Sequence, residues 1–263
     1  MRTTFRWFCG TMLLAGLASP VTVLANHPVL VEGEQDFDGD GLLGVDEDVD
    51  DATDQVFGTI GAALDAANAA ANQNGHVIIV TSGRFLETVV ITAANGDVTL
   101  QAAPGVEAEV EAVRAGDPDS ATRQGAPGIV IDAPANRRVT IRNIVSRNWT
   151  TGVLIRGDSV VLIEDCRIEH NLNFNIRTID DGRVAIVGSS ITAAGFRNGA
   201  GLENVPDPGI GISFEGRSRG VVADSTVSGS FGAGIANRTG RNRRVQVEDS
   251  VVLFGNSPNL SRR

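Results

Sequence analysis

The chain contains an internal repeat with a period in the twenties. Five short apolar stretches each begin with a glycine or an asparagine, at intervals of 24, 23, 36 and 23 residues. The interval of 36 residues equals one of 23 plus an insertion of 13 residues. The five initial residues are Gly128, Gly152, Asn175, Gly211 and Gly234. A constant period of this length is typical of solenoids, in which one repeat buries its apolar face only by stacking on the next.

Two further sets of apolar residues follow the first set in phase. The second set begins at Val139, Val161, Val184, Val221 and Val245, and the third contains Ile168, Ile191, Val227 and Val252. Three short alternating segments in each repeat of about 23 residues predict an all-β fold, a parallel β-helix. We expect this β-helix over residues 76–258, with a loop insertion near residues 193–208 that is rich in Gly and Pro. Acidic or amide residues such as Asp165 are expected at the corners, because they tolerate left-handed backbone angles.

The first 25 residues have the pattern of an export signal. Arg2 and Arg6 precede a short apolar run over residues 7–17, and the sequence before Asn26 fits cleavage after Ala25. The apolar run is too short for a stable membrane span. The sequence therefore predicts a protein that is secreted or periplasmic and has no membrane span.

Residues 26–54 form an acidic segment that contains a complete calcium-loop pattern, D-x-D-x-D-G-x5-E. Calcium binds six to eight oxygen atoms, which alternating carboxylates and a backbone carbonyl can supply. The expected ligands of one Ca²⁺ ion are Asp36, Asp38, Asp40, the Leu42 carbonyl and Glu47. The segment is similar to EF-hand and dockerin calcium loops. The alternative is a solvated acidic linker that binds no ion.

Residues 55–75 are expected to form an amphipathic capping helix. Ile60, Ala63, Leu64 and Ala67 recur at helical spacing and fall on one face of the helix that we expect to begin at Phe57. A solenoid exposes an unpaired edge at each end, so a helix here would cover its first turn.

This N-terminal region also resembles a known family. The pattern Phe57-x-Thr59-Ile60, followed by Gly83-x-Phe85-x-Glu87, resembles the opening of pectinesterase-like proteins. The later repeats are similar to those of the wider pectin-lyase-like superfamily of right-handed β-helices. The resemblance implies a right-handed parallel β-helix, a fold that carries esterases, lyases, hydrolases and non-enzymes. The pectinesterase catalytic motifs are missing, and the partners that Asp180-Asp181 would need in a polygalacturonase-like site are missing as well.

Charge is distributed unevenly along the chain. Residues 26–136 contain 20 acidic residues and 3 arginines, whereas residues 137–263 contain 12 acidic residues and 17 arginines. All 22 basic residues are arginine, and the chain has no lysine and no tyrosine, which excludes these two residues as catalytic bases. The net charge of −10 argues against nucleic acid as a partner.

Arginines recur in the turns between the first and second segments of the repeats. Equivalent turns of a solenoid stack along one edge, so these arginines are expected to form a basic ridge. The predicted substrate-binding residues on the ridge are Arg217, Arg219, Arg241 and Arg243. Guanidinium groups bind carboxylates and sulfates with two parallel hydrogen bonds, which suits an acidic polysaccharide. The alternative is that the arginines only keep the turns soluble.

Charged residues also mark the outward face of the first segments. If the isoleucines of this set point inward, a line of charged side chains should point outward beneath the insertion. The candidate catalytic residues are Arg156, Arg177, Asp180, Glu215 and Arg238. We also expect Trp149 either to stack on a sugar ring beside this face or to cover the core. Isolated in a loop, His170 is a weak catalytic candidate.

These observations predict a secreted β-helix that engages an extracellular acidic polysaccharide. If it is an enzyme, β-elimination from a uronate is the candidate reaction, which would need an unusual arginine base. The alternatives are a non-catalytic cell-surface or matrix module, and a structural solenoid that self-associates through its oppositely charged halves.

Overall fold

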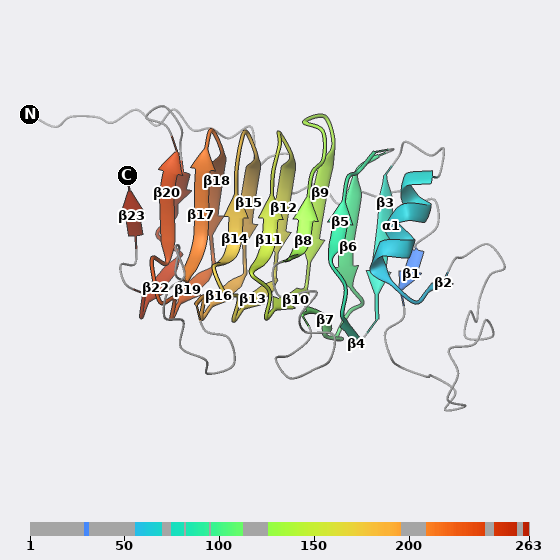
Figure 1. Cartoon of the computed structure of the whole chain (residues 1–263), viewed down its shortest axis with the longest axis horizontal. Helices are drawn as coiled ribbons and strands as arrows, with labels where there is room; N and C mark the ends of the chain where they lie inside the picture. The colour runs from blue at the N-terminus through green and yellow to red at the C-terminus, as the bar shows by residue number, and fades with distance from the viewer. Residues whose placement is uncertain are drawn as a thin grey trace, which may run out of the picture.

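The computed structural model describes residues 29–31, 56–69, 75–81, 83–94, 96–112, 126–195, 209–239, 245–256 and 260–262. Three parallel sheets stack the turns of the chain along one axis, and a single helix lies at the N-terminal end of the described structure (Figure 1). The predicted export signal, the predicted calcium loop and residues 196–208 of the insertion lie outside the described residues.

The first sheet, sheet A, has nine strands. In spatial order they are β2 (Val56–Phe57), β1 (Val29–Val31), β3 (His76–Val80), β6 (Val98–Ala102), β9 (Arg138–Arg142), β12 (Val160–Glu164), β15 (Arg183–Val187), β18 (Arg219–Ala223) and β21 (Val245–Val247). Apart from β1 and β2, neighbours in this order come from successive turns of the chain. Sheet A is therefore the longest continuous surface of the solenoid.

Two seven-stranded sheets complete each turn. Sheet B contains β22 (Val252–Phe254), β19 (Thr226–Ser228), β16 (Ser190–Thr192), β13 (Arg167–Glu169), β10 (Ile144–Arg147), β7 (Ala108–Glu111) and β4 (Gly83–Phe85). Sheet C contains β23 (Leu260–Arg262), β20 (Ile235–Thr239), β17 (Ile210–Gly216), β14 (Phe174–Thr178), β11 (Thr151–Ile155), β8 (Pro127–Ile131) and β5 (Val89–Ile91). The chain runs from sheet A to B to C and then returns to A, which is a parallel β-helix.

The register of sheet C confirms the predicted repeat. Val153 pairs with Ile129 and Ile176, and Ile212 pairs with Ile176 and Ile235. The residues that precede these partners are the five initial residues of the repeat. All five partners are fully buried, so the first set of apolar segments stacks in phase as the spacing predicted.

In the second and third sets, the prediction is wrong by one residue at one position each. Val184 pairs with Gly220 and not with Val221, because the ring of Phe214 occupies the space that a side chain at residue 220 would need. A Cβ atom on Gly220 would lie 2.0 Å from this ring. In the last turn Leu253 pairs with Val227, and Val252 points outward and is 53% exposed.

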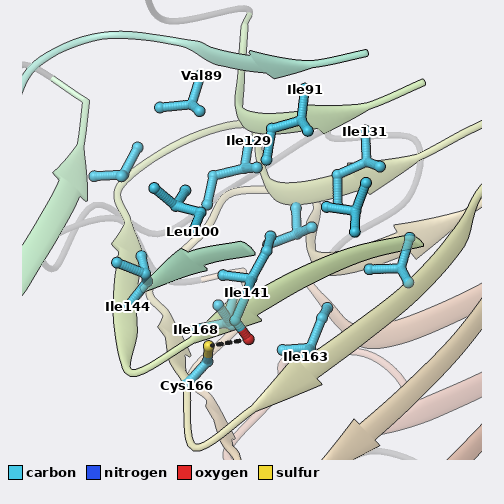
Figure 2. Close-up of a cluster of buried hydrophobic side chains, with 14 of the residues drawn as sticks. Val89, Ile91, Leu100, Ile129, Ile131, Ile141, Ile144, Ile163, Cys166 and Ile168 are labelled. Atoms are coloured by element: carbon cyan, nitrogen blue, oxygen red, sulfur yellow. Dashed lines mark hydrogen bonds between the residues drawn. The ribbon is translucent and has the colours of Figure 1, made fainter. Parts of the chain in front are cut away.

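Isoleucine, valine and leucine side chains from all three sheets fill the interior. Figure 2 shows Ile129 and Ile131 beside the equivalent residues Val89 and Ile91 of the preceding turn. The thiol of Cys166 is buried in the same cluster, and its sulfur lies 3.5 Å from the carbonyl oxygen of Ile141. Burial raises the pKa of this thiol to about 12. Cys166 is therefore a protonated core residue at neutral pH.

The corners between sheets A and B use the predicted residue types. Asn143, Asp165 and Asp224 each have a positive φ angle, between 47° and 54°. These side chains tolerate the left-handed conformation that a corner of one or two residues requires. His170 has a φ of 54° at the next corner, between sheets B and C, so it lies in a turn as expected.

The capping helix α1 (Ile60–Ala69) covers the first turn with the four predicted apolar residues, all of which are buried. Phe57, expected to begin the helix, lies instead in β2, because Thr59 accepts a hydrogen bond from the Ala62 amide and is the N-cap. Glu87, which follows β4, accepts hydrogen bonds from the amides of Ile60 (2.7 Å) and Gly61 (2.9 Å). A carboxylate at a helix N-terminus is stabilised by the helix dipole, so Glu87 fastens the cap to the solenoid.

Candidate functional site

The described part of the basic ridge includes a row of arginines at the start of the sheet A strands. In register, the residues of this row are Arg138, Val160, Arg183 and Arg219, on β9, β12, β15 and β18. The three arginines are exposed, and we call them the arginine row. Their guanidinium groups make no ion pair or hydrogen bond with another described residue, although the backbone amide of Arg138 donates a hydrogen bond of 2.8 Å to the carboxylate of Asp97.

The closest charges in the arginine row are on adjacent strands. Arg183 and Arg219 are direct partners, and neighbouring strands lie about 4.8 Å apart. Like charges placed directly opposite each other destabilise a sheet. The pair therefore raises the energy of the free protein, and an anion that contacts both guanidinium groups would relieve the repulsion.

The other predicted ridge residues have different surroundings. Arg217 lies in the preceding turn, where its guanidinium pairs with Asp181, although its side chain is 68% exposed. Arg241 and Arg243 lie outside the described residues. Of the four predicted substrate-binding arginines, the structure therefore places Arg219 in the arginine row and Arg217 beside it.

The candidate catalytic residues form two groups on sheet C. Arg177 donates two hydrogen bonds to Glu215, at 3.2 and 2.8 Å, and Ser213 donates a third at 2.9 Å. Arg238 approaches the same carboxylate at 3.9 Å. The guanidinium of Arg177 also lies 4.8 Å from the centre of the Phe174 ring, a cation–π contact. The structure therefore brings together three of the five candidates.

Arg156 and Asp180 lie apart from this first group. Arg156 pairs with Asp132 at 2.9 Å, and the carboxylate of Asp180 accepts a hydrogen bond from the Gly157 amide at 3.3 Å. In sheet C register, the position between Arg156 and Glu215 belongs to Ile179. The predicted continuous line of charges is therefore interrupted by an aliphatic residue.

Trp149 occupies the core and is not available to a sugar ring. Its side chain is fully buried, and its indole Nε1 donates a hydrogen bond of 2.9 Å to the carbonyl oxygen of Val110. The prediction that Trp149 stacks on substrate is therefore wrong, and its alternative role of covering the core is confirmed. Burial is favoured because the large ring fills the corner between sheets B and C, where Gly128 leaves space for it.

A charged network on sheet B was not predicted from the sequence. Residues 105–127 look like a polar excursion, yet Ala108–Glu111 form β7. The alternation of acidic and small or apolar residues over Glu107–Glu111 is the signal that identifies this strand. Arginines from three neighbouring segments pair with its carboxylates. The network contains Arg84, Glu107, Glu109, Glu111, Arg147 and Arg167.

Glu111 is the buried centre of this network. Its side chain is 0% exposed and accepts hydrogen bonds from Arg84 Nε (2.7 Å) and Asn148 Nδ2 (2.6 Å). Arg147 also pairs with it, at 3.5 Å, and with Glu109. Burial acts to raise the pKa of Glu111, but Arg147, Arg84 and Asn148 outweigh it and hold this pKa below its ordinary value. Glu111 therefore stays ionised inside the protein.

Glu107 and Glu109 form an unequal carboxyl pair. Burial raises the pKa of Glu109, and its hydrogen bond with Glu107 acts in the same direction. The same hydrogen bond is the main reason that the pKa of Glu107 is lowered. Glu107 also accepts a hydrogen bond from Arg167 at 2.8 Å. Because each carboxylate of the network has an arginine partner, we interpret the network as a structural link between β4, β7, β10 and β13.

Among the described residues, no His, Cys, Asp and Glu side chains gather in a group of three or more that could hold a metal ion. Within the same part of the chain, no helix is long and apolar enough to cross a membrane.

The comparisons with known proteins identify the fold family. Residues 127–258 match the family model of the right handed beta helix region. The chain belongs to this family of right-handed β-helices. The right-handed β-helix that the family resemblance implied is therefore confirmed. No curated protein sequence matches this β-helix chain.

Two solved structures are similar to this β-helix at low sequence identity. The first is the pectin methylesterase from Aspergillus niger in deglycosylated form, with 14% identity and a TM-score of 0.45. The match covers 90% of this chain and 86% of that one. The second is pectate lyase Pel9A, with 13% identity and a TM-score of 0.42, covering 92% of this chain and 78% of that one.

Proposed function

We propose that this protein is exported and binds an extended acidic polysaccharide through the arginine row. The observation that supports this function best is the direct pairing of Arg183 with Arg219 without an acidic partner among the described residues. The row lies along the axis of the solenoid, so it suits a ligand that carries several negative charges in a line. Guanidinium groups bind carboxylates and sulfates through parallel hydrogen bonds.

The chemistry of the rest of the chain favours a polysaccharide over nucleic acid. The net charge is −10, and residues 26–136 carry an excess of 17 negative charges. A nucleic acid presents a dense and continuous array of phosphates, which this acidic half would repel. A polysaccharide that carries one charge per sugar ring meets less repulsion and needs only the local cluster of arginines.

Binding at the arginine row of sheet A is better supported than catalysis at sheet C. β-elimination would need an arginine that accepts a proton, but Arg177 already uses Nε and one Nη as donors to Glu215. Arg156 similarly donates to Asp132. The elimination reaction stays a prediction, and its test is ultraviolet absorbance from a new conjugated double bond during incubation with polyuronates.

Replacing the paired arginines should weaken binding to polygalacturonate. We expect Arg183→Ser to weaken binding about tenfold at low salt, and the double variant with Arg219→Ser about 30-fold, because each arginine contributes charge-assisted hydrogen bonds. Added salt should weaken wild-type binding steeply, since exposed charges are screened over about 10 Å at 0.1 M ionic strength. Isothermal titration calorimetry over a salt series measures both effects.

The matched control is Arg142→Ser on the same sheet. Arg142 is also exposed, but it pairs with Glu164 at 2.7 Å. Its replacement therefore removes the same charge and leaves the arginine row unchanged. We expect binding within about twofold of wild type, because an exposed ion pair contributes little. Equal losses for Arg142→Ser and Arg183→Ser would mean that only net charge matters. No binding of any polyuronate by wild type would reject the proposed function.

We propose in addition that the segment from Asp36 to Glu47 binds one Ca²⁺ ion. The complete sequence pattern and eleven acidic residues between Glu32 and Asp54 support this site. Calorimetry should show saturable calcium binding that Asp38→Ala combined with Glu47→Ala removes. Binding should also raise the thermal midpoint, because an ion that binds only the folded state stabilises it. The absence of heat and of any thermal shift would identify the segment as an acidic linker.

A further inference from the structure

The outer face of sheet A carries an uncharged strip beside the arginine row. Two residues further along each strand of this row, the outward-facing side chain is neutral, and the same holds at the equivalent position of the neighbouring strands of sheet A. In register across seven strands, they are Val77, Thr99, Thr140, Leu162, Ala185, Val221 and Gln246. We call this set the neutral strip. In a chain with 21% charged residues, seven neighbouring positions without a charge form a distinct surface.

The neutral strip is accessible. Its members from Val77 to Val221 are half-buried, and Gln246 is exposed. They alternate with fully buried residues such as Ile141, Ile163 and Ile186, so their side chains point away from the core. Thr140 and Ala185 are small, which keeps the surface level on either side of Leu162.

The two surfaces lie within reach of one ligand repeat. Residues separated by two positions on a strand are about 6.6 Å apart, and the strands repeat about every 4.8 Å along the axis. Both rows therefore run parallel to the solenoid axis. On the other side of the strip the charged residues of the next row are Arg142 and Glu164, which neutralise each other, and Glu248, which is acidic. Negative charge on a ligand is thus attracted to one side of the strip only.

Resting on the proposed function, we infer that the ligand is a pyranose polymer lying along the axis, with ring faces on the neutral strip and carboxylates or sulfates on the arginine row. The C–H-rich faces of sugar rings gain free energy when they cover the apolar surface of Leu162 and Val221. The hydroxyls of Thr99 and Thr140 can hydrogen-bond to ring hydroxyls. A polymer gains from both rows if the rings beside the arginines present their charges to that side.

A membrane surface fits this face less well. Proteins that bind at the lipid interface insert protruding apolar side chains among the headgroups. The apolar residues of the neutral strip are only partly exposed. The net charge of −10 also opposes approach to an anionic bilayer. A polymer that lies on the surface needs no insertion.

Ala185→Arg separates this arrangement from simple charge attraction. Ala185 lies in the middle of the neutral strip, and the new side chain adds positive charge while it blocks ring packing. We expect binding of polygalacturonate oligomers to weaken about tenfold, equivalent to about 1.4 kcal/mol. Inorganic polyphosphate, which has charges but no rings, should bind equally well or more tightly. Calorimetry of the purified protein with both polymers at low salt gives the comparison.

A second variant protects the test against misfolding. Leu162→Gln removes apolar surface without adding charge, and it should weaken polygalacturonate binding about threefold while leaving polyphosphate binding unchanged. Ala185→Thr is the control, because a threonine is compatible with a strand and remains small. We expect Ala185→Thr to bind both polymers like wild type.

Each outcome has a separate meaning. If Ala185→Arg binds both polymers more tightly than wild type, sugar rings do not pack on the neutral strip, and only the arginine row is the binding site. If wild type sediments with phosphatidylserine vesicles and Ala185→Arg does not, the ligand of the neutral strip is a membrane surface and the inferred polymer is rejected. Failure of wild type to bind polygalacturonate would instead reject the proposed function itself.

Discussion

Trp149→Ala is expected to lower the free energy of unfolding by about 4 kcal/mol, a typical loss when a fully buried aromatic side chain is truncated. The indole is 0% exposed and lies at the corner between sheets B and C. Its removal leaves a cavity and deprives the Val110 carbonyl of its 2.9 Å hydrogen bond. Because a β-helix is stabilised mainly by contacts between neighbouring turns, a gap at one turn weakens both neighbours. Chemical denaturation followed by circular dichroism measures the change.

Trp149→Phe is the matched control for this prediction. The phenyl ring keeps most of the apolar volume but cannot donate to Val110, so we expect a loss of only about 1–2 kcal/mol. The difference between the two variants then reports the packing contribution. A Trp149→Ala protein as stable as wild type would mean that the corner collapses around the missing ring, which contradicts the close contacts described for Gly128 and Trp149.

The same contact explains why the repeat could be recognised in the sequence. A Cβ atom on Gly128 would lie 2.5 Å from the Trp149 ring, and one on Gly152 would lie 2.6 Å from the Asn171 amide. On Gly211 it would lie 2.5 Å from the Gly234 carbonyl oxygen. Glycine is required here by close approach to the neighbouring turn. The interval between these glycines therefore equals the length of one turn, and this regular interval predicts the fold.

Other features depend on contacts that have no local signal in the sequence. Gly220 occupies an inward position where the sequence pattern suggests its neighbour Val221. It must be glycine because the ring of Phe214, from the preceding strand, fills the space that a side chain would take. Trp149 looks like a surface aromatic residue in its own loop, and only the packing of neighbouring turns shows that it is internal. β7 was missed because its acidic residues suggest a solvated loop, whereas arginines distant in the chain neutralise them.

The candidate site was predictable to the extent that it follows the repeat. Turns at equivalent positions stack, so the presence of a basic ridge could be expected from Arg183 and Arg219. Which arginines remain unpaired could not be expected, because Arg217 finds Asp181 and Arg156 finds Asp132 only in the folded chain. The neutral strip depends on register across seven strands, which a one-residue error would move to the other face.

Glu111→Ala is expected to destabilise the protein by about 3 kcal/mol at pH 7, through the network that sequence analysis missed. Removing one member of a buried ion pair is costly because its partners lose their compensating charge. Arg147 has a side chain only 22% exposed, and Asn148 is buried, so neither can be fully rehydrated. The change is measured from urea denaturation of wild type and variant at the same ionic strength.

The pH dependence of this difference provides a second readout. Folding lowers the pKa of Glu111, so its ionised form stabilises the protein above the unfolded pKa of about 4.3, and this contribution is lost as pH falls through the folded value. The gap between wild type and Glu111→Ala should therefore narrow below about pH 4. Burial raises the pKa of Glu109, which acts in the opposite direction, and the charge of Glu111 adds to this rise, so the opposing contribution is smaller in Glu111→Ala.

Glu107→Ala is the matched control, because it removes the same side chain type from the same segment at an exposed position. Glu107 has a side chain 52% exposed, and its pairing with Arg167 is open to solvent. We expect a loss below about 1 kcal/mol, since exposed ion pairs contribute little. Equal losses for the two glutamates, or a Glu111→Ala effect that is the same at pH 3 and pH 7, would contradict a buried ionised Glu111 that links the strands of sheet B.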